Sequence, residues 1–133
     1  MNPPSFLTGS LQVALGGALG AWLRYAAGLA VSRSLGPGNQ FPWATLGVNV
    51  LGSLAMGLLA GWLARHGSGG ESWRLLLGVG LLGGFTTFSA FSLELALMIQ
   101  RGALGTAVAY AAVSVLAGVF ALFAGLALMR VAA

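Results

Sequence analysis

The segment from Gly83 to Phe91, GGFTTFSAF, places two glycines and several hydroxyl side chains in the middle of a long apolar stretch. Each glycine lowers helix propensity by about 1 kcal/mol relative to alanine. The hydroxyls of Thr86, Thr87 and Ser89 can satisfy backbone groups that a broken helix leaves free. The pattern predicts a helix break. Its free carbonyl oxygens would suit a small cation, and the amino end of the next half-helix would suit an anion.

Two phenylalanines follow the expected break. Phe88 and Phe91 are three residues apart and therefore share one face of a resumed helix. An aromatic ring is negative on its face and positive at its edge, so two edges directed at one point would make a weak anion site. The same spacing also fits rings that face lipid or a packed core, and both interpretations stay open here.

A second polar face lies in the preceding apolar stretch, where Thr45, Asn49, Gly52, Ser53 and Met56 recur at helical spacing. The amide of Asn49 can donate a hydrogen bond to an anion. Asn and Ser also hydrogen-bond routinely between membrane helices, so the face serves either a ligand or helix packing.

Further polar residues lie in other apolar stretches. Thr106, Tyr110 and Ser114 recur every four residues and would either line an ion path or satisfy neighbouring carbonyls. Glu94 is the one acid within a span, a position where ionisable groups are usually functional. Arg24 lies toward the end of the first stretch, where an arginine anchors a helix at the membrane interface.

The composition requires that these residues be positioned by membrane helices. The chain of 133 residues is 58% hydrophobic and 6% charged, whereas soluble domains have roughly 25% charged residues. The 22 glycines are spread through the apolar stretches, which is typical of closely packed membrane helices. The absence of cysteine excludes thiol chemistry, and the absence of a basic cluster argues against nucleic-acid binding.

Four stretches are long enough to cross a bilayer, which predicts an all-α integral membrane protein with one transmembrane domain over residues 1–133. The expected spans are Leu11–Val31, Thr45–Ala64, Arg74–Ile99 and Leu104–Met129. The break would lie in the middle of the third span. The glycine-rich GGALGAWLRY of the first span indicates close helix packing.

The arginines give almost no orientation signal. Arg65, Arg74 and Arg130 lie on the side of the termini, and Arg33, Arg101 and a snorkelling Arg24 lie opposite. Orientation follows the side that is richer in Lys and Arg, and here the sides are balanced. We therefore predict dual topology, in which copies insert both ways and pair as an antiparallel homodimer. A transport route would then form between subunits.

Three motifs resemble the Fluc (CrcB) fluoride channels: GGALGAWLRY, TLGVNVLGSLAMG and GGFTTFSAFSLE. The resemblance covers all four spans and implies a dual-topology homodimer with two antiparallel fluoride pores at the subunit interface. It also supplies fluoride as the ion, which the residue patterns alone do not select.

The resemblance implies a role for each matching residue. Phe88 and Phe91 would form ring-edge stations in the pore, with Asn49 as a polar donor beside them. A structural Na⁺ on the dimer axis would be held by the backbone carbonyls of Gly83 and Thr86. Further matches to the family's positions are Tyr110, Ser114, Glu94 and Arg24. The motif reads TTFSAF where many relatives have TTFSTF, so Ala90 removes one hydroxyl.

The expected function is a passive channel in the inner membrane that exports fluoride from the cell, with fluoride, lipid and a second copy as partners and no enzymatic activity. The alternative is a dual-topology, proton-coupled exporter of small cationic drugs. Such an exporter typically needs a carboxylate in the first span, whereas the acid here is Glu94, late in the third. A non-transporting assembly protein is a third possibility and leaves the Phe and Asn pattern unexplained.

Overall fold

The computed structural model describes residues 4–36, 39–66 and 70–131, and all of its regular elements within these ranges are helical. Helix α1 spans Phe6–Leu35, α2 spans Trp43–His66 and α6 spans Leu104–Val131. The third segment consists of α3 (Glu71–Trp73), the π-helix η2 (Arg74–Leu82), α4 (Gly83–Phe85) and α5 (Phe88–Gln100). Within the described ranges, four helical segments are long and apolar enough to cross a membrane.

Each long helix extends beyond the span expected from the sequence. Helix α1 begins at Phe6, after Ser5, whose hydroxyl accepts a hydrogen bond from the Thr8 amide, and it ends before Gly36 at φ 76°. Hydropathy marks only the apolar part of a helix. The backbone ladder continues into interfacial residues until a cap or a left-handed glycine ends it.

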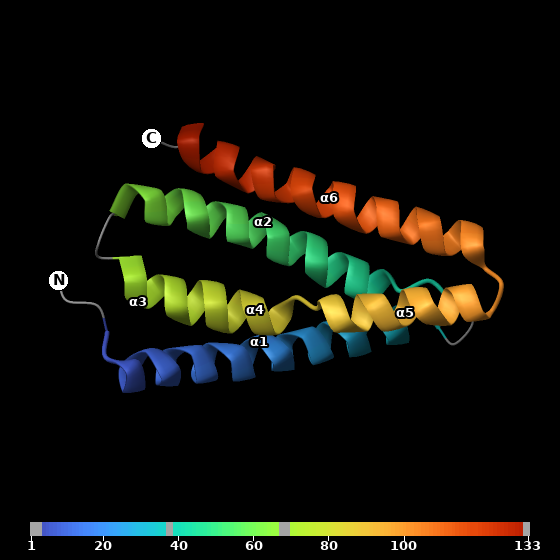
Figure 1. Cartoon of the computed structure of the whole chain (residues 1–133), viewed down its shortest axis with the longest axis horizontal. Helices are drawn as coiled ribbons and strands as arrows, with labels where there is room; N and C mark the ends of the chain where they lie inside the picture. Colours follow the sequence, from blue (N-terminus) through green and yellow to red (C-terminus); the bar gives the residue numbers. More distant parts are fainter. Residues whose placement is uncertain (1–3, 37–38, 67–69, 132–133) are drawn as a thin grey trace.

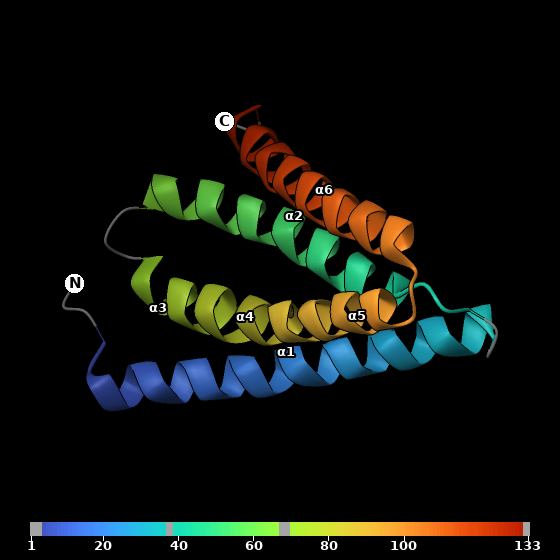
Figure 2. The ribbon, with the colours of Figure 1, turned by 45° about the vertical axis from the view of Figure 1, so that its right-hand side comes forward.

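The four segments pack as a bundle, in which α1 contacts α2 as well as the third segment, and α5 contacts α6. In the views of Figures 1 and 2 they appear in the order α6, α2, the α3–α5 segment and α1. Helix α2 packs mainly against α6, and α1 packs mainly against η2 and α4. The start of α1 and the end of α6 lie at the same end of the molecule (Figure 1), as an even number of spans requires.

Glycines allow these helices to touch through their backbones. A Cβ at Gly16 or Gly20 of α1 would overlap the carbonyl oxygen of Leu76 or Leu81 in the π-helix. Gly57 of α2 is equally close to the backbone of α6. The close-packing role predicted for the first-span glycines is confirmed.

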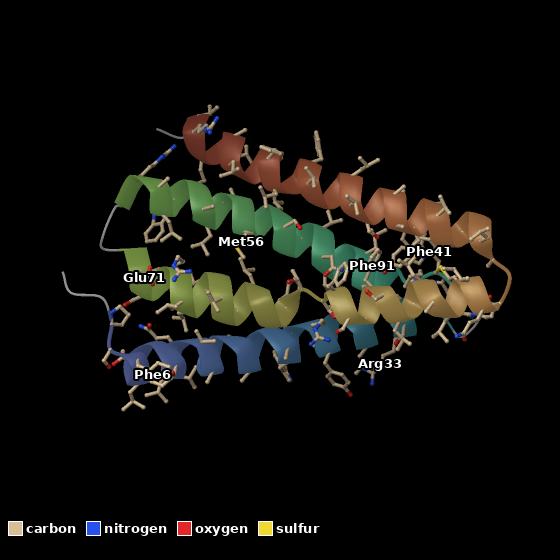
Figure 3. The ribbon with its side chains drawn as sticks, viewed as in Figure 1. Phe6, Arg33, Phe41, Met56, Glu71 and Phe91 are labelled. Carbon is tan, nitrogen blue, oxygen red and sulfur yellow. The ribbon has the colours of Figure 1, made fainter. Side chains whose placement is uncertain are left out.

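The buried core is small. Tyr110 is the largest fully buried side chain, and it clusters with Phe91, Met98 and Ala107 where α5 meets α6. At most 22% of the most apolar window in any spanning segment is buried within the chain. Figure 3 shows side chains projecting outward along every segment. The uncovered apolar surface suits contact with lipid or another chain.

Candidate functional site

The third segment leaves helical geometry for two residues. Helix α4 ends at Phe85, Thr86 is extended at φ −80° and ψ 159°, and Thr87 is extended at φ −151° and ψ 122°. Helix α5 then starts at Phe88, as the ribbon between α4 and α5 shows in Figure 1. The Thr87 hydroxyl caps α5 by accepting a hydrogen bond from the Ala90 amide at 3.2 Å. The Thr86 hydroxyl donates to the Leu82 carbonyl at 2.9 Å.

Asn49 of α2 binds the extended backbone of Thr87. Its amide nitrogen donates to the Thr87 carbonyl at 3.0 Å, and its amide oxygen accepts from the Thr87 N–H at 2.8 Å. Asn49 therefore does join two helices, one of the two roles that the sequence left open. An Asn amide carries two N–H groups, so a second donor remains for another partner.

Arg24 contacts the other side of the interruption. Its Nε donates to the Gly84 carbonyl at 3.1 Å, and the side chain is partly buried. Because α1 continues to Leu35, Arg24 lies well inside the helix and not near its end, where the sequence suggested an interface anchor. The contact satisfies a carbonyl that the interrupted helix leaves without its usual partner.

Two further carbonyl groups at the interruption have no donor in the described ranges. The Thr87 amide, which would bond the Gly83 carbonyl in a continuous helix, bonds Asn49 instead. The Ala90 amide, which would bond the Thr86 carbonyl, bonds the Thr87 hydroxyl. Among the described residues, no donor reaches either oxygen.

A cavity of about 310 Å³ opens beside the interruption. It is bounded by α2, the start of α5 and α6, and Figure 3 shows Met56 of α2 directed toward the third segment. The Ser114 hydroxyl lies here, buried and without a hydrogen-bond partner in the described part of the chain. The lining residues are Asn49, Gly52, Ser53, Met56, Thr86, Thr87, Phe88, Phe91, Ser114, Val115 and Leu122.

The cavity brings together four of the six residues expected in a pore: Asn49, Phe88, Phe91 and Ser114. It also contains Val115 and Leu122, which the sequence did not indicate, because no local pattern reveals how α6 crosses α2. Gly52, Ser53 and Met56 share the helical face of Asn49, so that face was the signal for them.

The two phenylalanines have different environments. Their ring centroids are 5.7 Å apart with planes tilted by 40°. Phe91 is 9% exposed and lies 5.1 Å from the Tyr110 ring, whereas Phe88 is 79% exposed. Phe91 is therefore fixed by packing within the chain, and Phe88 projects from it.

Glu94 and Tyr110 lie beside the cavity rather than in its lining. The Glu94 carboxylate accepts hydrogen bonds from the Thr45 hydroxyl at 2.6 Å and the Tyr110 hydroxyl at 2.7 Å. Tyr110 also packs edge-on against Phe41 at 5.4 Å. Of the expected stripe on the fourth span, Tyr110 is thus occupied by Glu94, Ser114 lines the cavity and Thr106 is exposed.

Comparison with known proteins connects this arrangement to a family. The family model described as CrcB-like protein, Camphor Resistance (CrcB), matches residues 11–126. A protein named fluoride-specific ion channel FluC from Novosphingobium aromaticivorans is 61% identical over 124 residues, covering 93% of this chain and 98% of the relative. Proteins of the same name from Phenylobacterium zucineum and Caulobacter vibrioides are 60% and 55% identical over 121 residues, covering 90% of this chain and 94% of each relative.

These names are those of ion channels and not of enzymes, in agreement with the prediction that the chain catalyses no reaction. The resemblance seen in the sequence motifs is confirmed by a match over most of the chain. Together with the four apolar helices, these matches show that the protein is a multi-pass membrane protein and that it belongs to the CrcB family.

Proposed function

We propose that the protein is a fluoride-selective channel that lets fluoride leave the cell passively across the inner membrane. One observation carries the proposal: the 310 Å³ cavity collects Asn49, Phe88, Phe91 and Ser114 beside interrupted backbone at the middle of the third segment. Irregular backbone at membrane depth is tolerated where protein or a water-filled cavity surrounds it. The relatives named fluoride-specific ion channels supply the identity of the ion.

The chemistry of the cavity suits a small anion in transit. The second N–H of Asn49 and the unpartnered Ser114 hydroxyl can donate to fluoride, and the phenylalanine edges attract it weakly. Conduction needs sites weak enough to release the ion. Chloride, which is larger, would fit a narrow aromatic-lined path poorly.

We further propose that the chain works as an antiparallel, dual-topology homodimer with two pores along the interface. Phe88 projects from the chain, and the cavity opens onto uncovered apolar surface, so a second copy would complete its walls. Cross-linking in native membranes tests this pairing. Monomers that conduct fluoride would contradict it.

A Na⁺ ion fits the interruption as a structural group. The carbonyl oxygens of Gly83 and Thr86 have no donor among the described residues, and unwound backbone carbonyls are typical Na⁺ ligands. Two copies related by an axis would supply two such pairs. These carbonyl oxygens would hold the ion as neutral ligands, and carbonyls from both copies around one Na⁺ would join the copies. Exchange of Na⁺ for N-methylglucamine should then lower dimer stability, and equal stability in the two buffers would contradict the assignment.

The channel assignment is tested by fluoride efflux from liposomes, read with an ion-selective electrode, beside matched chloride-loaded vesicles. We expect fast fluoride release with little chloride release, and slower fluoride release for Phe88→Ile and Phe91→Ile. No fluoride release from well-folded dimers would remove the channel assignment. Membrane fractionation of the cells tests the proposed location.

A further inference from the structure

A second hollow lies away from the proposed pore, near the end of the molecule where α2 and α6 finish. It is a groove of about 380 Å³ between α2, the start of the third segment and α6. It shares no residue with the cavity beside the interruption. Its lining is apolar and aromatic: Leu58, Leu59, Trp62, Trp73, Leu77 and Met129.

Arginines lie close to the lining residues in the sequence, although none of them lines the groove itself. Arg65 continues the stripe of Leu58 and Trp62 along α2 by one turn, because residues three and four apart share a helical face. Arg130 lies one residue beyond the lining residue Met129 on α6, at nearly the same height but turned about 100° from it around the helix. Arg74 follows Trp73, but it already pairs with Glu71 at 2.8 Å. Within the described ranges, Arg65 and Arg130 have no acidic partner.

The tryptophans indicate the depth of this end in the membrane. Trp62 and Trp73 line the groove with their rings in an edge-to-face contact at 6.3 Å. Tryptophan is enriched where the hydrocarbon core meets the headgroups. The helix rise places Arg65 roughly 10 Å beyond Leu58 along α2. The groove therefore runs from hydrocarbon depth toward the headgroup region. Its own lining is apolar, and Arg65 and Arg130 lie beyond it at the headgroup level.

We propose that this groove binds an acidic phospholipid. One acyl chain lies along Leu58, Leu59 and Leu77, and the headgroup phosphate contacts Arg65 and Arg130. Basic pockets between membrane helices recognise anionic headgroups in this way. An occupant with an apolar tail and a negative head matches both the apolar lining and the arginines beyond it, whereas a zwitterionic lipid matches only the lining.

A second copy of the chain fits this groove less well. The sequence has only two acidic side chains. Glu71 pairs with Arg74, and Glu94 accepts from Thr45 and Tyr110. A second copy therefore has no free carboxylate side chain to place against Arg65 and Arg130, and an anionic lipid does.

Native mass spectrometry tests the proposal on the purified protein in micelles containing equal amounts of palmitoyl-oleoyl phosphatidylglycerol and phosphatidylcholine. We expect retained phosphatidylglycerol to exceed phosphatidylcholine. Arg65→Gln and Arg130→Gln should each lower that preference roughly fivefold. Arg101→Gln is the matched control at the opposite end, where Arg101 bonds the Leu97 carbonyl, and it should retain the full preference.

Circular dichroism and size-exclusion chromatography of each variant establish that the fold is intact. Equal retention of the two lipids by the unmodified protein would overturn the proposal, as would a phosphatidylglycerol preference that survives the Arg65→Gln, Arg130→Gln double change. Leu58→Cys provides a third measurement, because the chain has no other cysteine. Blocked maleimide labelling of this cysteine in dimers that retain no lipid would show that the partner covers the groove, and would overturn the proposal.

Discussion

Asn49 supplies hydrogen-bond partners to backbone groups that extended geometry leaves unpaired at membrane depth. The Thr87 N–H and carbonyl lack helical partners and have no bulk water, and an unsatisfied group in this environment costs several kcal/mol. One side chain satisfies both groups, because an amide has a donor and an acceptor side by side. The residue that shapes the interruption is thus also a candidate ligand, and one substitution probes both roles.

We expect Asn49→Asp to slow fluoride efflux at least roughly tenfold. The carboxylate can still accept from the Thr87 N–H, but it leaves the Thr87 carbonyl without a donor, which costs about 1–3 kcal/mol. It also adds a negative charge beside the proposed anion path. Liposome efflux with an ion-selective electrode measures the change.

Asn39 offers a matched control for this substitution. It bonds the Phe41 N–H and carbonyl in the same two-sided way, but in an exposed loop. Asn39→Asp should leave fluoride efflux unchanged. Equal rates for the two Asp variants would mean that Asn49 has no special part in conduction.

Glu94 separates the channel from a proton-coupled exporter. Its carboxylate is held by the Thr45 and Tyr110 hydroxyls, and Glu94→Gln keeps one acceptor oxygen for them. A passive channel should therefore keep fluoride efflux within roughly tenfold of normal, since one weakened hydrogen bond is worth about 1 kcal/mol. An exporter should lose all proton-driven uptake of tetraphenylphosphonium. Fluoride efflux and tetraphenylphosphonium uptake are measured in the same vesicles. The exporter would be favoured if the unmodified protein showed no fluoride efflux and if Glu94→Gln abolished its tetraphenylphosphonium uptake.

At the scale of the elements, local propensity indicates the region of the interruption but not the residues that leave the helix. Gly83 and Gly84 have the lowest helix propensity, yet both stay helical, and the extended residues are Thr86 and Thr87. Tertiary contacts decide this. Gly84 packs against the backbone of α1, and the lack of a side chain at Gly52 leaves space for the Thr86 methyl group. Neither contact can be inferred from a single span.

The sequence likewise does not predict the π-helix η2. Its stretch RLLLGVGLL has ordinary apolar composition, and nothing in it distinguishes a five-residue from a four-residue hydrogen-bond repeat. Gly80 lies against the backbone of α1 at Val13 and Gly16. The wider helical turn is adopted where two backbones meet, and that meeting depends on residues far apart in the chain.

Glycines at helix contacts should not be exchangeable for alanine. A Cβ at Gly20 would overlap the Leu81 carbonyl, which is rigid backbone, so we expect Gly20→Ala to destabilise the protein by about 1–3 kcal/mol. Gly28 lies on the same helix with no atom within 4 Å of a built Cβ. Gly28→Ala should be neutral or stabilising by up to about 1 kcal/mol, since alanine favours helix. Thermal unfolding in detergent compares the two, and equal losses would contradict the packing argument.

At the scale of the whole molecule, the number of helices and their order follow from hydropathy, but their partners do not. Three described arginines lie at the end of the molecule where α1 begins and α6 finishes, and two lie at the opposite end. Arg24 belongs to neither end, because it bonds the Gly84 carbonyl at the interruption. Without Arg24 in the count, the two ends differ by a single arginine. The orientation signal is therefore still weak, as dual insertion requires. The arginines at the two ends are Arg65, Arg74 and Arg130, and Arg33 and Arg101.

Added charge should therefore decide the orientation. Three lysines at the exposed positions Ser34, Gln40 and Gln100 would enrich one end, and two at Ala64 and Ser72 would enrich the other. Each variant alone should insert one way only and form no antiparallel pair. Growth in fluoride of a strain lacking its own channel measures the result.

Each lysine variant expressed alone should leave the strain sensitive, and the two expressed together should restore resistance. This complementation is specific to opposite orientations, because a variant that is merely unstable would not be rescued by a second defective variant. Full resistance from either variant alone would mean that one orientation suffices. The cavity walls would then have to be completed by a parallel partner or by lipid.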